Sequence, residues 1–405
     1  MKTCCVIGLG YIGLPTAAVL AKNGFKVIGV DINKDIVKKI NNAEIHINET
    51  GLSELVKEVV NQGSLEARET PTNADIFIIT VPTPLRDNNN NIPCPDISYV
   101  KQAVSSIIEL INEGNLIILE STSPVGTTDE IAELIISKTN LSLDKFHIAY
   151  CPERVIPGKT LEELISNSRI VGGVNISSAL EAKKLYESFC KGEIYITNSK
   201  TAEITKLSEN TYRDINIAFA NELSIISESL NIDVGEIIEL ANKHPRVNIL
   251  QPGCGVGGHC IAVDPWFIAS QSPNESDLIQ TARKVNLNKP KWIIEKIKEK
   301  IDFYQTKQNR VLNIGCFGLA YKPDTEDIRE SPALEIVKDL IKSGYKVLTT
   351  EPNLDNHLDI ELFETEEVLN KSDIYIFLVS HHEFKNLEIN KDKIILDFCG
   401  LNQKK

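Results

Sequence analysis

A glycine-rich stretch near the middle of the chain concentrates the residue types that could do chemistry. It reads NKHPRVNILQPGCGVGGHCIAVDPWFI over residues 242–268, and its glycine run ends just before His259 and Cys260. Glycines let the backbone approach a ligand closely, and Asp264 follows the cysteine by one helical turn. The thiolate is the nucleophilic form of cysteine, and a helix that started at this residue would favour that anion. The stretch therefore predicts a reactive thiol, although a lone cysteine is more often a small core residue.

The beginning of the chain carries a dinucleotide-binding pattern. TCCVIGLGYIGLPTAAVLAKNGFKVIGVD predicts a strand, a glycine turn, a helix and a second strand that ends at Asp31. The G-x-G-x-x-G spacing provides a tight turn, close approach to a pyrophosphate and close packing of the helix. The carboxylate would bind ribose hydroxyls and repel a 2′-phosphate, which favours NAD over NADP. The turn residues expected at the cofactor are Gly8, Gly10, Tyr11, Ile12 and Gly13.

Two further apolar runs, at 74–84 and 115–128, predict strands that end in hydroxyls and prolines. Ligands gather at the carboxyl ends of strands in a doubly wound sheet, so we expect Thr83 and Thr122 near the cofactor. The alternative is that these threonines only cap helices. Between the runs, RDNNNNIPCP predicts a mobile surface loop.

A third run, at 145–158, predicts a strand that leads to Glu153 and Arg154. The carboxylate could transfer a proton and the guanidinium could bind an anionic or hydroxyl-rich ligand. Both could instead belong to an ordinary ion pair.

Residues 201–230 predict one long helix, because they lack glycine and proline and carry apolar residues at helical spacing. Lys206, Asn210 and Arg213 fall on one stripe of this helix. Such a stripe is usually solvated, but an ammonium, an amide and a guanidinium together could hold an oxyanion and an anionic substrate.

A second α/β pattern follows a charged segment. Strands are predicted at 310–318, 346–352, 373–380 and 393–400, with a helix near 332–343. The pattern lacks the full glycine fingerprint, which indicates a Rossmann-like domain for a different nucleotide. After its first strand, GLAYKPDTEDIRESP offers Tyr321, Lys322 and Arg329 for phosphates, unless this is only a solvated loop.

Composition narrows the class of protein. A chain of 405 residues with 42% hydrophobic content can form two or three domains, and a net charge of −13 makes nucleic acid an unfavourable partner. Nine scattered cysteines without a C-x-x-C pair favour reduced, cytoplasmic thiols. No signal peptide, membrane-spanning run or metal-ligand cluster is recognisable in the sequence.

The motifs GLGYIGLP, VPTP, STSPVG, CPERVIPG, KLSENTYRDINIAFANEL, HPRVNILQPGCGVGGHCIAVDPWF and GLAYKPDTEDIRESP run in order along the whole chain. In this order they resemble the UDP-glucose/GDP-mannose dehydrogenase family. The resemblance implies oxidation of a sugar-nucleotide C6 alcohol to a carboxylate by two NAD+ in succession. It also implies that the Cys260 thiolate traps the intermediate aldehyde as a thiohemiacetal, which is oxidised to a thioester and then hydrolysed.

The resemblance implies roles residue by residue. Lys206 and Asn210 match residues that stabilise the oxyanion and assist proton transfer, Asp264 and Thr122 match a pair that activates water, and Glu153 matches an acid or base. The implied substrate contacts also include Arg154, Val155, Lys206, Asn210, Arg213, His244, Arg246, Gly257, Tyr321 and Lys322. Arg329 matches a cofactor contact. Arg246 matches an arginine that can reach into a neighbouring subunit, which implies at least a dimer.

The chain departs from the UDP-glucose branch of that family around the nucleophile. His259 and Val263 stand beside Cys260 and Asp264, and Pro157 replaces a second glutamate. These changes favour an N-acetylated hexosamine. The preference for UDP-N-acetylmannosamine, for surface polysaccharide, rests on resemblance alone, and UDP-N-acetylglucosamine and UDP-glucose are the alternatives.

The predicted fold has two Rossmann-like doubly wound domains joined by a long central helix and a helical middle domain. The boundaries are an NAD-binding domain at 1–199, a dimerisation and catalytic domain at 200–304 and a UDP-sugar domain at 305–405. Two other classes remain: a two-electron hydroxy-acid dehydrogenase, which would not need Cys260, and a non-catalytic nucleotide sensor.

Overall fold

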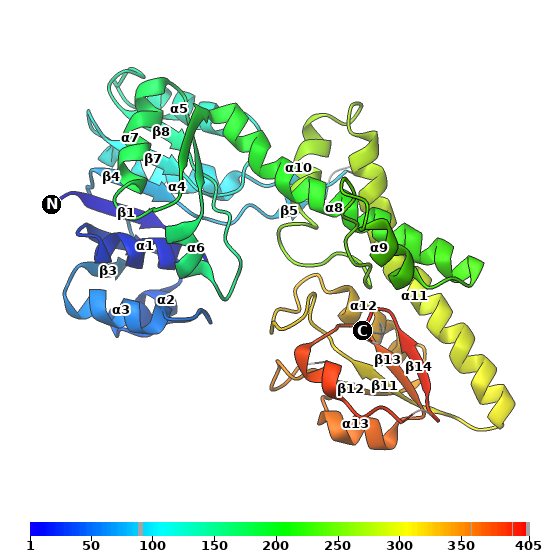
Figure 1. Ribbon diagram of the computed structural model, residues 1–405. Coiled ribbons are helices and arrows are strands. Elements are labelled where there is room, and N and C mark those ends of the chain that lie inside the picture. The colour runs from blue at the N-terminus through cyan, green and yellow to red at the C-terminus, as the bar shows by residue number, and fades with distance from the viewer. Residues whose placement is uncertain (88–91, 358, 391, 402–405) are drawn as a thin grey trace. The chain divides into compact units, whose positions relative to one another are not determined.

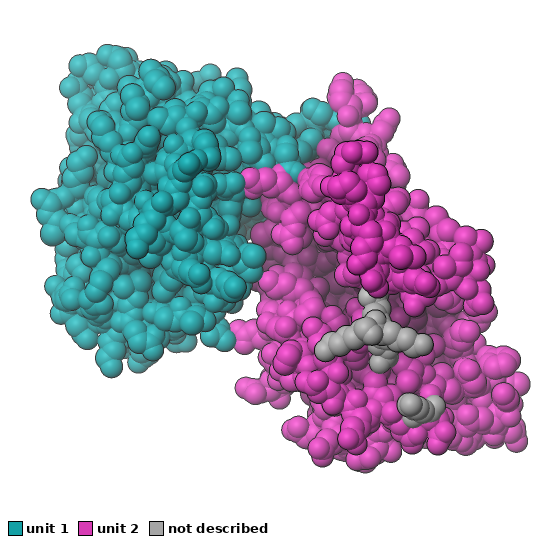
Figure 2. All heavy atoms as spheres, in the orientation of Figure 1, with its two compact units in different colours: residues 1–208, 266–273 teal, residues 209–265, 274–405 magenta. Residues whose placement is uncertain are grey.

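The computed structural model describes residues 1–87, 92–357, 359–390 and 392–401. The chain divides into two compact units (Figure 2): residues 1–208 with 266–273 form unit 1, and residues 209–265 with 274–405 form unit 2. The boundary between the units falls within two helices. The division into three domains stays a prediction.

Unit 1 is built on an eight-stranded sheet in the order β10-β9-β8-β7-β4-β1-β2-β3 (Figure 1). Its strands are β1 (Thr3–Ile7), β2 (Lys26–Val30), β3 (Leu65–Arg68), β4 (Ile76–Ile79), β7 (Leu116–Leu119), β8 (His147–Tyr150), β9 (Arg169–Gly173) and β10 (Ile194–Asn198). All neighbours pair in parallel except β8 and β9, which are antiparallel. The helices are α1 (Gly13–Lys22), α2 (Lys34–Asn41), α3 (Leu52–Asn61), α4 (Ser98–Ile107), α5 (Thr127–Lys138), α6 (Thr160–Ser166) and α7 (Ile176–Tyr186).

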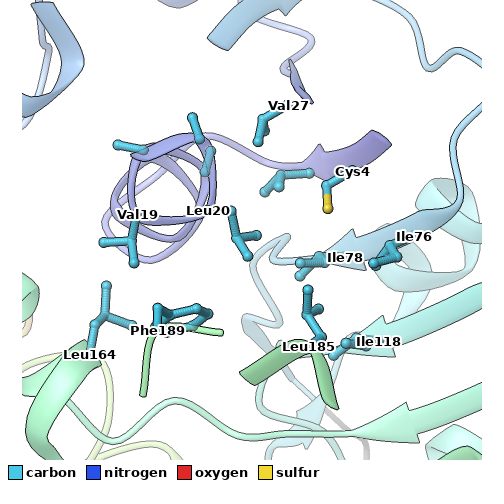
Figure 3. Packing of buried hydrophobic residues seen from close by; sticks show 14 of the residues in the cluster. Cys4, Val19, Leu20, Val27, Ile76, Ile78, Ile118, Leu164, Leu185 and Phe189 are labelled. Carbon is cyan, nitrogen blue, oxygen red and sulfur yellow. The ribbon is translucent and has the colours of Figure 1, made fainter. Parts of the chain in front are cut away.

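Strand β1 shows how the sequence covers both faces of this sheet. Cys4 and Val6 point into a cluster with α1, α3 and α7, whereas Cys5 and Ile7 point into a second cluster with α4 and α5. Figure 3 shows the first cluster, in which Leu20 of α1 packs towards strand residues. Strands buried on both faces read as unbroken apolar runs, which is why these strands are recognisable in the sequence.

The predicted surface loop RDNNNNIPCP lies partly outside the described residues. Its ends form the short antiparallel strands β5 (Leu85–Arg86) and β6 (Cys94–Pro95), and nothing is described for residues 88–91. Strands β9 and β10 and helix α7 extend unit 1 beyond the last strand that the sequence predicts.

Unit 2 contains a four-stranded parallel sheet in the order β12-β11-β13-β14. Its strands are β11 (Asn313–Phe317), β12 (Lys346–Thr350), β13 (Ile374–Phe377) and β14 (Ile394–Asp397), and its helices include α9 (Val234–Ala241), α11 (Asp277–Gln308), α12 (Pro332–Lys342) and α13 (Thr365–Lys371). The predicted strands and the helix near 332–343 are confirmed. Helices α11 and α12 pack on one face of the sheet in a single hydrophobic cluster. Helix α13 covers the other face of the sheet.

Two helices span the boundary between the units: α8 (Ser199–Leu230) and α10 (Asp264–Gln271). Helix α8 matches the predicted long helix. Among the described residues, no helix is long and apolar enough to cross a membrane.

Candidate active site

The glycine turn after β1 is tightly packed at one glycine and open to a ligand at another. A Cβ atom on Gly13 would lie 1.8 Å from the Gly8 carbonyl oxygen, so α1 can begin this close to the strand only with glycine here. A Cβ on Gly10 would meet no atom within 4 Å. The turn is therefore closed towards the protein and open at Gly10, as a pyrophosphate cradle requires.

Asp31 follows β2 and faces the same turn. Its Oδ2 accepts the backbone N–H of Leu9 at 3.0 Å, and its Oδ1 accepts that of Asn33 at 2.9 Å. The side chain is half-buried, and Tyr11 beside it is exposed. A fixed carboxylate with remaining acceptor capacity at the end of the second strand fits the ribose of an NAD molecule.

Replacing Asp31 with alanine should lower kcat/KM for NAD by roughly 10- to 100-fold, because hydrogen bonds to a charged group are lost. Activity with NADP should rise relative to NAD, since the repelling carboxylate is gone. Initial rates with both cofactors measure the change. Asp35→Asn, an exposed neighbour at the start of α2, is the matched control. An unchanged preference would contradict the role of Asp31.

Thr83 and Thr122 meet at the carboxyl ends of the paired strands β4 and β7. The Thr83 hydroxyl donates to the Thr122 backbone oxygen at 2.7 Å. The structure therefore brings these two predicted residues together, and among the described residues neither hydroxyl caps a helix.

Glu153 forms the ion pair that the sequence left as an alternative. Its Oε2 lies 3.0 Å from Arg169 Nη2, and its Oε1 accepts the backbone N–H of Arg154 at 2.8 Å. Arg154 in turn donates to the Ser168 carbonyl oxygen. Val155 packs against the unit 1 core. Arg169 starts β9 and, through Glu153, holds the loop that carries the predicted contacts, and no sequence motif indicated it.

Glu120, directly after β7, is also buried. It accepts the Tyr186 hydroxyl at 2.6 Å. Burial, opposed by the Arg169 charge, raises the pKa of Glu120 from 4.5 to about 7. A buried carboxyl group therefore keeps its proton in the folded protein at pH values where the unfolded chain has lost it.

The expected consequence is a loss of stability as the pH rises. Between about pH 4.5 and 7 the unfolded state has released this proton and the folded state retains it, so the free energy of unfolding falls by about 1.4 kcal/mol per pH unit, or about 3 kcal/mol. Glu120→Gln should lack this slope and should exceed the wild type in stability at pH 8 but not at pH 4.5. Urea unfolding at both pH values tests it, and parallel pH profiles would contradict it.

Lys206 and Asn210 occupy successive turns of α8, and their side chains are only 9% and 8% exposed, whereas Arg213 is exposed. The first two thus do not belong to a solvated stripe. Within the described part of the chain, the Lys206 ammonium makes no hydrogen bond or ion pair. A nearly buried cation without an acceptor is suited to binding an anionic atom of a ligand.

Cys260 and Asp264 are joined by one backbone turn. The Asp264 N–H donates to the Cys260 carbonyl oxygen at 2.9 Å, but α10 begins only at Asp264. Cys260 therefore lies in the turn before the helix. Asp264 is 3% exposed, and its Oδ2 accepts the Asn210 amide at 2.6 Å. The structure thus connects three of the predicted catalytic residues within unit 2.

The glycine loop before Cys260 packs against the loop after β11. Gly258 has a φ of +78° and donates its N–H to the Arg329 carbonyl oxygen at 3.1 Å. A Cβ atom would lie 2.8 Å from the Tyr321 ring at Gly258 and 2.4 Å from the Glu330 carbonyl oxygen at Gly257. Glycine is needed here for protein packing, in addition to any approach of a ligand.

The remaining predicted contacts in unit 2 lie at its surface or in these loops. Arg329 is held by Asp327 through bonds of 2.8 and 2.6 Å, and burial, with the charge of Arg329, lowers the pKa of His259. His244 and Arg246 lie in the exposed turn after α9, where the Arg246 N–H donates to His244 Nδ1.

A series of hydrogen bonds between buried side chains supports the glycine loop, and no sequence motif indicated it. Arg283 of α11 donates to Asp214 of α8 at 2.6 Å, and Asn286 donates to the same carboxylate at 2.8 Å. Asn221 donates to Asn286 at 2.9 Å and accepts the N–H of Gly253 at 2.9 Å. The spacing of Asp214 and Asn221, two helical turns apart on one face, is the signal that could have indicated it.

A mostly parallel sheet and a parallel sheet, each with a glycine turn after its first strand, are combined with an acidic residue after β2 and a thiol-bearing glycine loop. Together these features define a nucleotide-dependent dehydrogenase. Family models agree over most of the chain: the NAD binding domain of the UDP-glucose/GDP-mannose dehydrogenase family matches residues 2–190, its central domain 200–288 and its UDP binding domain 315–404. The chain belongs to the UDP-glucose/GDP-mannose dehydrogenase family and is an NAD-dependent dehydrogenase.

Individual relatives are similar over their whole length. A UDP-N-acetyl-D-mannosamine dehydrogenase of Campylobacter jejuni is 51% identical over 412 residues, 98% of each chain. An NDP-N-acetyl-D-galactosaminuronic acid dehydrogenase of Ralstonia nicotianae is 44% identical, covering 99% of this chain and 96% of its own. The solved UDP-D-ManNAc dehydrogenase of Pyrococcus horikoshii superposes with a TM-score of 0.88 at 39% identity, over 100% and 96% of the two chains.

Proposed function

We propose that this protein oxidises C6 of UDP-N-acetyl-D-mannosamine to the carboxylate of UDP-N-acetyl-D-mannosaminuronate. The balanced reaction consumes the alcohol, two NAD+ and one water, and yields the carboxylate, two NADH and three protons. The observation that carries the four-electron reaction is the joining of Cys260, Asp264 and Asn210 within one turn and one buried hydrogen bond. The names of the similar dehydrogenases from Campylobacter jejuni and Pyrococcus horikoshii support the choice of sugar.

The cofactor would be held by the glycine turn and Asp31, with Thr83, Thr122 and Arg329 as further contacts. Bound NAD+ supplies a hydride acceptor for each of the two oxidations. The Cys260 thiolate adds to the C6 aldehyde and forms a thiohemiacetal, so the reactive aldehyde stays on the protein between the oxidations. After the second oxidation, C6 is a thioester of Cys260.

Lys206 and Asn210 are proposed to donate to the oxygen on C6 where negative charge develops. Asp264 and Thr122 would orient the water that attacks the thioester, and cleavage of the C–S bond returns the thiolate. Glu153, which accepts bonds at both oxygens, is better placed to orient the Arg154 loop than to deliver a proton. The proposed sugar-nucleotide contacts are Arg154, Val155, Arg213, His244, Arg246, Gly257, Tyr321 and Lys322.

A homodimer through the central helices is part of the proposal. Exposed apolar side chains form one stripe along α8 at Tyr212, Phe219, Ile226 and Leu230, with exposed fractions of 45 to 66%. Their spacing of seven and four residues places them on one face of the helix. Such a stripe supports an interface with a second copy, and light scattering of the purified protein tests it. The reaction is proposed to supply an aminouronic acid for surface polysaccharide from the cytoplasm.

NADH formed per mole of sugar nucleotide tests the function. The panel is UDP-N-acetylmannosamine, UDP-N-acetylglucosamine, UDP-glucose and GDP-mannose. Two NADH on the first substrate alone is the expected result. Turnover mainly of another member would keep the mechanism and replace the substrate, whereas one NADH on every substrate would refute the four-electron reaction.

A further inference from the structure

The two sheets begin with the same backbone device. Gly8 after β1 has a φ of +93° and donates to the Val30 carbonyl oxygen at 2.8 Å, and Gly318 after β11 has a φ of +96° and donates to that of Thr350 at 2.9 Å. The acidic residue after the second strand then accepts N–H groups of the turn. In unit 2 this residue is Glu351, which accepts Leu319 at 2.7 Å and Ala320 at 3.0 Å.

The two acidic residues differ in what else can reach them. Asp31 is half-buried and open to a ribose, whereas the side chains of Glu351 and its partner His381 are both 0% exposed. Burial raises the pKa of Glu351, but the bonds from His381 and the two backbone N–H groups outweigh it and lower the pKa overall. Glu351 has become an internal acceptor and cannot bind ribose hydroxyls as Asp31 can.

His381, in the segment after β13, uses both ring nitrogens. Nδ1 accepts the backbone N–H of Asp324 at 3.0 Å, which places the ring proton on Nε2, and Nε2 donates to Glu351 Oε2 at 3.0 Å. Asp324 and His381 also lie near Glu383, at distances that would suit a metal ion. Because both ring nitrogens of His381 are already hydrogen bonded, we interpret Asp324, His381 and Glu351 as a hydrogen-bond network and not as a metal site.

These bonds hold the loop after β11 at two points. Glu351 fixes residues 319 and 320, and His381 fixes Asp324, which has a φ of +57°. Between the two anchors lie Tyr321 and Lys322, the proposed contacts to the sugar nucleotide. The Tyr321 ring also packs on Gly258, two residues before Cys260.

We propose that His381 and Glu351 are positioning residues that fix the 321–323 segment for the nucleoside diphosphate of the substrate. This inference rests on the proposed function, because it needs a UDP-sugar bound at Tyr321 and Lys322. The unit 2 sheet has the glycine turn that is typical of a dinucleotide site. Its acidic residue, Glu351, binds the backbone of the loop after β11 instead of a ribose, and the proposed ligand contacts come from that loop.

Three variants of His381 separate the two bonds. The amide oxygen of asparagine can replace Nδ1 but leaves Glu351 without the bond from His381 Nε2. The amide nitrogen of glutamine can replace Nε2 but leaves the Asp324 N–H without the Nδ1 acceptor. Alanine removes both. The matched control is His382→Ala, because His382 is exposed and bonds Asp324 through its backbone N–H, which alanine keeps. Calorimetry measures dissociation constants for UDP alone and for NAD+.

The dissociation constant for UDP should rise about tenfold or more in His381→Ala and by a smaller factor in the asparagine and glutamine variants, because a buried network is left partly unsatisfied. KM for the sugar nucleotide should rise with it, while NAD+ affinity and the control variant stay within about twofold of the wild type. If His381→Ala does not fold, Glu351→Gln, which keeps the side-chain volume, should likewise raise the UDP dissociation constant without changing NAD+ affinity.

Lowered thermal stability with an unchanged UDP dissociation constant would overturn the proposal, because a merely structural role predicts that result. Equal losses of UDP and NAD+ affinity would overturn it as well. Failure of the proposed function gives a different result, because the wild-type protein would then not bind UDP or not form two NADH per sugar nucleotide.

Discussion

Replacing Cys260 with serine should abolish the formation of two NADH per sugar nucleotide while both nucleotides still bind. A serine hydroxyl is almost entirely protonated at neutral pH and adds poorly to an aldehyde. Loss of a nucleophile lowers kcat by ~10³-fold or more in enzymes that use covalent catalysis. NADH release and calorimetric binding of UDP and NAD+, measured on one preparation, check both halves of the expectation.

The same loop offers a matched control in Cys254. Its side chain is buried, its thiol donates to the Leu378 carbonyl oxygen at 3.3 Å, and burial raises the pKa of Cys254 to about 12. A serine there keeps the hydrogen bond, so Cys254→Ser should retain the two-NADH stoichiometry. A Cys260→Ser protein with normal stoichiometry and rate would show that the covalent mechanism is wrong.

The fold was predictable where local pattern and burial coincide. Strands β1, β4 and β7 are buried on both faces and read as apolar runs, and α8 has apolar residues at helical spacing without glycine or proline. Helix α11 was missed because Pro290 and many lysines and glutamates suggested a charged connection. Its buried face is nevertheless regular, with Ile293, Ile297 and Ile301 four residues apart.

The candidate site was predictable to the extent that its chemistry is contained in short motifs. The turn from Cys260 to Asp264 and the glycine turn with Asp31 are local, so spacing alone indicates them. The partners that hold them are distant in sequence: Arg169 lies 16 residues from Glu153, and His381 lies 30 residues from Glu351. Charged residues are usually at the surface, and only the folded chain shows which ones are paired inside.

Removing either member of the Asp214–Arg283 pair should have the largest effect on stability. Both side chains are at most 2% exposed, and Arg283 Nη1 of α11 lies 2.6 Å from Asp214 Oδ1 of α8. Asp214→Leu would leave a buried guanidinium without its counter-ion, and Arg283→Met would leave a buried carboxylate, each at a cost of about 3–5 kcal/mol. Urea unfolding of the single variants measures the loss in the free energy of unfolding.

The double variant Asp214→Leu with Arg283→Met should lose much less than the sum of the single losses, because no unpaired charge remains inside. Arg310→Met is the surface control, since Arg310 pairs with Asp373 at 2.8 Å but is half exposed and should contribute about 1 kcal/mol or less. Additive losses in the double variant would contradict the coupling. The chain from Asp214 through Asn286 and Asn221 to Gly253 also predicts that a stable double variant turns over more slowly, because the loop that ends at Cys260 depends on this anchor.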